Sequence, residues 1–171
     1  MISAEKIEKL RILVSRFRDN VSDYERSDYN EAQLRSDYIN PFLQLFGWDV
    51  DNSQGLPQNL REVIQEGKVR VHERNKKPDY VCRVRGMRKY FIETKKPSIG
   101  ILSDLKSAFQ LRRYGWSARM PISVLTNFKD LVIYDCRVIP KEGDDPRIAR
   151  IHHFTFNEYE KKIDEIYEIL S

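Results

Sequence analysis

The sequence is poor in cysteine, with Cys82 and Cys136 the only two among 171 residues. Two thiols without metal-type spacing form neither a disulfide framework nor a zinc site, and they are typical of a reducing compartment. The chain has no run of about 18 apolar residues and no signal-peptide pattern, so we expect no membrane partner and a cytoplasmic location. It also lacks a Gly-x-x-x-x-Gly-Lys-Ser/Thr loop and a glycine-rich methyl-donor site, which argues against ATP hydrolysis or methyl transfer.

Charge is what the sequence has in abundance. A third of the residues are charged, and the formal net charge is +4. A basic balance fits a polyanionic partner, although an excess of four charges is modest and their placement matters more. The length predicts one domain with a sizeable core, and the sequence shows neither repeats nor low-complexity segments.

Helical patterns dominate the first third of the chain. Apolar residues at helical spacing predict an amphipathic helix over residues 1–20, followed by a polar loop over 21–29. Asp28 with Glu31 three residues later resembles a capping box that opens the next helix. Glu31 then points toward the core side, and Pro41 is expected to kink this helix or to start a second segment. Further on, residues 60–64 and 68–72 could pair as a hairpin.

The chain is organised around residues 77–95, which predict two short strands joined by a turn at Gly86. Counting back from a two-residue turn places Asp79 opposite Thr94 and therefore beside Glu93. A one-residue shift or a bulge would instead put both carboxylates on the same face, and the sequence leaves both registers open. Strand alternation places Glu93 and Lys95 on one face in either case.

This arrangement favours a metal-assisted reaction. Two neighbouring carboxylates repel each other unless a cation lies between them. Carboxylate oxygens suit Mg²⁺, which takes one or two such ligands and completes its shell with water and phosphate. An ammonium group beside the ion can orient a water molecule or stabilise charge on a phosphate oxygen. Asp79, Glu93 and Lys95 therefore form a set that could hydrolyse a phosphodiester, although the same residues could also make a plain surface ion cluster.

Pro78-Asp79 followed by Glu93-Thr94-Lys95 resembles the signature of PD-(D/E)XK nucleases. A predicted helix over residues 103–115 follows, in which Gln110 and Tyr114 match the QxxxY element of one branch of these nucleases. The wider sequence, from residue 29 to the C-terminus, resembles the N-terminal nuclease domain of combined restriction–modification enzymes of type IIG. It is similar, more distantly, to the N-terminal domain of type I restriction motor subunits.

The resemblance implies an α/β fold of the restriction-endonuclease type, with a mixed central sheet flanked by helices. Residues 1–171 would form one nuclease domain, with an N-terminal helix and loop over 1–28 and the core over 29–171. It would be part of a longer protein that carries methyltransferase and target-recognition domains. A helix between the Glu93 strand and a strand at 122–126 would make these two strands parallel.

The resemblance also implies Mg²⁺-dependent cleavage of double-stranded DNA, with Mn²⁺ as a substitute ion. Asp79, Glu93 and the backbone carbonyl of Thr94 would hold the metal, and Lys95 would position or activate the attacking water. Glu31 and Gln110 would complete the site, supported by Tyr114; Glu31 corresponds to a position where many members of the family carry an additional metal-site glutamate.

Two alternatives remain open from the sequence. One is a DNA-repair or junction-processing nuclease of the same fold, which would prefer branched or ended DNA. The other is a non-catalytic DNA-binding domain, which would bind DNA with a steep salt dependence and leave phosphodiesters intact.

Overall fold

A computed structural model describes residues 1–26, 28–66, 69–71 and 74–171, with the strands at 69–71 and 74–76 described as backbone only. Within these ranges six strands form one mixed sheet in the order β1-β4-β5-β6-β7-β8, and β2 pairs with β3 in a separate ribbon. The strands are β1 (Val63–Gln65), β2 (Val69–Val71), β3 (Arg74–Lys76), β4 (Tyr80–Val84), β5 (Met87–Thr94), β6 (Ile122–Thr126), β7 (Asp130–Asp135) and β8 (Arg150–Thr155).

The predicted α/β architecture is confirmed. β5 and β6 are parallel, whereas the other neighbouring strands of the main sheet are antiparallel. Helix α4 (Leu105–Ser117) makes the crossover between the parallel pair, as its place in the sequence predicted. Asp104 is the N-cap of this helix, because its carboxylate accepts a hydrogen bond from the backbone N–H of Ser107.

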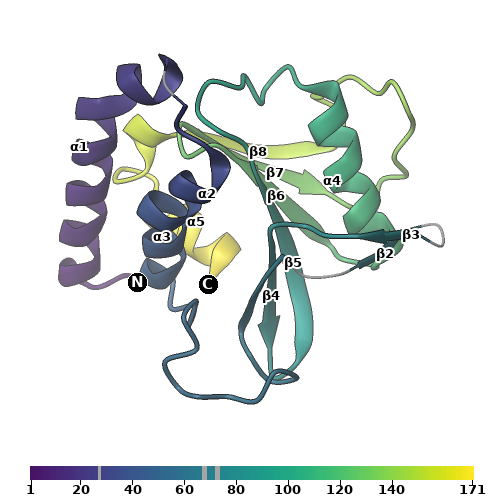
Figure 1. The fold of residues 1–171 in the computed structure, drawn as a ribbon, viewed down its shortest axis with the longest axis horizontal. Helices are drawn as coiled ribbons and strands as arrows, with labels where there is room; N and C mark the ends of the chain where they lie inside the picture. Colours follow the sequence, from purple (N-terminus) through teal and green to yellow (C-terminus); the bar gives the residue numbers. More distant parts are fainter. Residues whose placement is uncertain (27, 67–68, 72–73) are drawn as a thin grey trace.

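Helices cover the two faces of the sheet unequally (Figure 1). One face packs against α1 (Ala4–Arg26), α2 (Glu31–Leu34), α3 (Asn40–Leu45) and α5 (Ile163–Leu170), whereas α4 lies on the opposite face. Strand alternation explains this division, because Tyr80 and Ile92 enter the larger core while Val81 and Phe91 enter the core under α4. None of the described helices is long and apolar enough to span a membrane.

Helix α1 is longer than the sequence pattern predicted. The expected loop over residues 21–29 was wrong for its first part, because the helix continues to Arg26. Val21 and Tyr24 continue the apolar stripe of the helix beyond Phe17, at spacings of four and three residues, and both pack against the core. Burial of this apolar stripe against the core stabilises the helical conformation of a segment whose other residues are mostly polar.

The start of α2 also differs from expectation. Asn30, not Asp28, caps the helix, and its side chain and that of Gln33 form a reciprocal capping box. The helix then widens into a π-helical turn, η1 (Arg35–Ile39), before α3 begins next to Pro41. The predicted interruption near the proline is therefore confirmed, since a proline cannot donate a helical hydrogen bond to the preceding turn.

The hairpin predicted between residues 60–64 and 68–72 was wrong. β1 pairs with β4 instead, and β2 pairs with β3. Lys68 and His72 of the predicted partner segment lie outside the described residues. An apolar residue such as Val63, which is buried, gains more from the main sheet than from a two-stranded ribbon.

Candidate active site

A bulge brings the two candidate carboxylates to the same face of the sheet. The turn lies at Arg85 and Gly86, and the pairing of β4 with β5 shifts between Cys82 and Arg83. Beyond the shift, Tyr80 pairs with Ile92. Continuing this register places Asp79 opposite Glu93. Of the two registers that the sequence left open, the bulged one is therefore confirmed, and the pairing of Asp79 with Thr94 counted back from an unbulged hairpin was wrong by one residue.

Hydrogen bonds from β5 hold the Asp79 carboxylate in place. Its Oδ2 accepts from the Thr94 backbone N–H at 2.7 Å and from the Thr94 hydroxyl at 2.6 Å. Its Oδ1 lies 3.0 Å from Nη1 of Arg35, in an ion pair whose two side chains are 17% and 15% exposed. Asp79 is therefore fixed by two segments that are distant in sequence, the end of β5 and the start of η1.

Glu93 is the electrostatically strained member of the pair. Burial, and next the charge of Asp79, raise the pKa of its carboxyl group to about 8, although the Lys95 ammonium opposes the shift. Its Oε2 atom is buried and has no hydrogen-bond partner. An unpartnered carboxylate oxygen beside a second carboxylate is a position that a divalent cation would stabilise.

Glu31, Lys95 and Gln110 line one hollow of about 480 Å³ together with Asp104 and neighbouring residues. The negative charge of Glu31 contributes to the raised pKa of Glu93, so α2 delivers this acid to the end of β5. The backbone N–H of Lys95 donates to Thr126, which continues the parallel pairing past the end of the strand. The candidate residues thus come together at the C-terminal end of β5.

Gln110 and Tyr114 act as a pair on α4. Nε2 of Gln110 donates to the Tyr114 hydroxyl over 2.5 Å, one helical turn away. Burial raises the pKa of Tyr114, and the nearby Glu93 adds to the shift. Tyr114 therefore lies near the carboxylates, and it braces the glutamine that lines the hollow.

Comparison with known proteins shows which family the chain belongs to. The model of the type I restriction enzyme R protein N terminus matches residues 54–141, which is more than half of the chain. The chain belongs to this family. The matched range contains Asp79, Glu93, Lys95 and Gln110, whereas Glu31 lies before it.

A relative extends the similarity of this restriction-enzyme domain toward both of its ends. The chain is 41% identical over 167 residues to the type II restriction enzyme and methyltransferase RM.Eco57I of Escherichia coli. The alignment covers 96% of the chain but only 17% of that relative. The resemblance to type IIG and type I restriction enzymes is therefore confirmed. No solved structure matches the chain.

Arg35 is the site residue that sequence reasoning missed. It lies 44 positions before Asp79 in the sequence. The chain also contains many other arginines, so the sequence alone does not single this one out. A spacing signal existed, because Glu31 and Arg35 are four residues apart and share a helix face. The restriction-enzyme domain therefore brings one acid and one base from a single short helical segment to its candidate site.

The site fits a metal bound by few protein ligands. Across the described ranges, no group of three or more His, Cys, Asp or Glu side chains is arranged to enclose a metal ion. Asp79 and Glu93 are two carboxylates with the Lys95 ammonium near them, a donor set that suits a divalent cation with few protein ligands.

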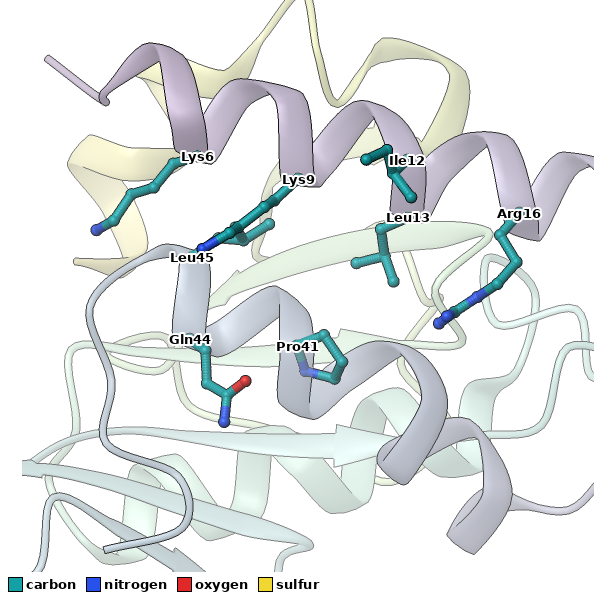
Figure 2. A pocket seen from close by; sticks show the side chains of 8 residues that line it. All are labelled: Lys6, Lys9, Ile12, Leu13, Arg16, Pro41, Gln44 and Leu45. Carbon is teal, nitrogen blue, oxygen red and sulfur yellow. The ribbon is translucent and has the colours of Figure 1, made fainter. Parts of the chain in front are cut away.

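A separate groove of about 420 Å³ lies between α1 and α3 and contains none of these residues (Figure 2). Its floor includes Leu13, Pro41 and Leu45, and Lys6 and Lys9 lie along its rim. It shares no lining residue with the hollow beside Lys95, which sets it apart from the candidate site.

Proposed function

We propose that this domain is the DNA-cleaving part of a restriction–modification enzyme and hydrolyses phosphodiester bonds. The observation that carries the proposal is the paired carboxylates of Asp79 and Glu93, with an unpartnered oxygen on Glu93 and Lys95 alongside. A purely structural domain gains nothing from burying a carboxylate beside a second one, because burial and repulsion at Glu93 raise the free energy of the folded state. The family match supports the same reading.

Asp79, Glu93 and the backbone carbonyl of Thr94 would hold Mg²⁺, and Mn²⁺ would substitute for it. When bound, the ion supplies positive charge that stabilises the phosphate in the transition state. Lys95 would position a water molecule for attack and stabilise charge on a phosphate oxygen. Glu31 would add a further carboxylate to the metal site and, with Gln110, would complete it, while Tyr114 fixes the Gln110 amide.

We propose that the substrate is double-stranded DNA and that the protein acts in the cytoplasm. The relative from Escherichia coli is named as both a restriction enzyme and a methyltransferase, and this chain spans 17% of its length. We therefore propose that methyl transfer and target recognition belong to other domains of a longer protein. On this account the isolated domain cuts weakly and without sequence preference.

A plasmid-nicking assay with Mg²⁺ or Mn²⁺ tests the proposal. Asp79→Ala and Lys95→Ala should each reduce nicking by about 100-fold or more, the scale expected for loss of one catalytic group. Lys89→Ala is a matched control, because Lys89 is an exposed lysine on the same strand and should leave nicking unchanged.

The same assay separates the alternatives. Undiminished nicking by pure Asp79→Ala and Lys95→Ala proteins would contradict the proposed mechanism. Salt-dependent binding of DNA without nicking by the unaltered domain would favour a non-catalytic binding domain. Faster cutting of branched or ended DNA than of intact duplex would favour a repair nuclease.

A further inference from the structure

Arg35 contacts the carboxylate that the proposed function assigns to a metal. It is the first residue of η1 and follows Glu31 by one helical turn. Its Nη1 lies 3.0 Å from Oδ1 of Asp79, and both side chains are mostly shielded from solvent. This ion pair therefore belongs to the site and is not an exposed surface contact.

The remaining contacts of Asp79 restrict where a metal could bind. Oδ2 already accepts two hydrogen bonds from Thr94, one from its backbone N–H and one from its hydroxyl. A carboxylate oxygen offers two lone-pair positions, so both positions on Oδ2 are used. An ion approaching Asp79 must then use Oδ1, where the Arg35 guanidinium already takes one lone-pair position and its positive charge repels a second cation.

We propose that Arg35 is an internal counter-cation that holds Asp79 in the metal-free protein and releases it when a divalent ion binds. The inference rests on the proposed function, because it assumes that Asp79 is a metal ligand. Arg35 is a positioning residue on this account: it neutralises a carboxylate in a cluster that also contains Glu31 and Glu93.

Two features suit Arg35 to this exchange. A guanidinium keeps its charge at all relevant pH values, so it neutralises Asp79 whenever the metal is absent. Arg35 also stands where the regular α2 helix changes to a π-helical turn, a local irregularity that is frequent at functional sites. The affinity of the site for a metal then reflects a competition between two cations for one oxygen.

Calorimetric titration with Mn²⁺ alone, without DNA, tests the exchange in the intact chain. Arg35→Gln should bind Mn²⁺ about tenfold more tightly than the unaltered protein, because the competing cation is gone. Arg35→Lys keeps the charge and should restore an affinity close to that of the unaltered protein. Arg137→Gln is the matched control, since it removes an arginine from an exposed ion pair with Asp135 and should not change the affinity.

Equal or weaker Mn²⁺ binding by Arg35→Gln would overturn the inference and leave the proposed function intact. That result would mean that Arg35 only braces Asp79 for the metal. Absence of Mn²⁺ binding by the unaltered protein and by every variant would remove the proposed metal site, and the inference with it.

A second measurement does not depend on the folding of a variant. The guanidinium NMR signals of Arg35 in the unaltered protein should shift in proportion to Mg²⁺ occupancy and lose the signature of an ion pair. Arg35 signals that stay unchanged at saturating Mg²⁺ would overturn the inference.

Discussion

Replacing Glu93 by glutamine should stabilise the metal-free domain. The pKa of Glu93 is raised from an ordinary 4.5 to about 8, first by burial and then by the charge of Asp79. At about 1.36 kcal/mol for each pH unit between these values, ionising Glu93 in the folded state costs roughly 5 kcal/mol at most. Partial exposure and relaxation reduce this cost, so we expect about 2 kcal/mol of stabilisation in Glu93→Gln at pH 8.5.

The sign of the pH dependence follows from proton binding. Between pH 4.5 and about 8 the folded domain retains a proton on Glu93 that the unfolded chain has lost. The contribution of Glu93 to the free energy of unfolding therefore falls as the pH rises through this window and is lowest above it. Glu93→Gln removes this contribution, so its advantage over the unaltered protein should be small at pH 5 and largest at pH 8.5.

Urea denaturation in the presence of a chelator measures the effect at both pH values. Glu168→Gln is the control, because Glu168 is an exposed glutamate on α5 and should leave both free energies unchanged. If Glu93→Gln gave the same difference in stability at pH 5 and pH 8.5, or destabilised the fold at both, the argument from a buried, repelled carboxylate would be wrong.

Three further predictions concern the fold. Gly115→Ala should destabilise the domain by about 2 kcal/mol or more in urea denaturation, because the added Cβ would overlap the side chain of Cys136. Gly100→Ala is the control and should be neutral, because its added Cβ would make only an ordinary van der Waals contact. Phe17→Ala should cost about 3–5 kcal/mol in the same assay, because this fully buried ring packs among four aromatic rings. Cys82 and Cys136 should react with a thiol reagent only after unfolding, because burial raises the pKa of the thiols to about 12 and about 11.

The parts of the fold that depend on local pattern could be predicted from the sequence. The apolar stripe of α1, the crossover helix after Pro97 and the strands around Phe91 and Val124 each carry a periodicity that sets their type. The family resemblance rests on the same segments, because the motif residues stand at the end of β5 and on α4.

The parts that depend on long-range packing could not. The bulge between Cys82 and Arg83 leaves no mark in the alternation of side chains, yet it decides that Asp79 faces Glu93. The cap at Asn30 competed with an equally good motif two residues earlier. The contact of Arg35 with Asp79 joins two segments whose approach depends on how α2 packs on the sheet. The roles of Asp79, Glu93, Lys95, Glu31 and Gln110 stay predictions that activity measurements must test.

A crystal of the domain soaked in Mn²⁺ tests the central claim most directly. The account predicts anomalous density for one ion between the carboxylates of Asp79 and Glu93, within bonding distance of Asp79 Oδ1 and with the Arg35 guanidinium moved away from that oxygen. A domain that nicks DNA in Mn²⁺ but shows no ion at this position, or an ion bound elsewhere, would contradict it.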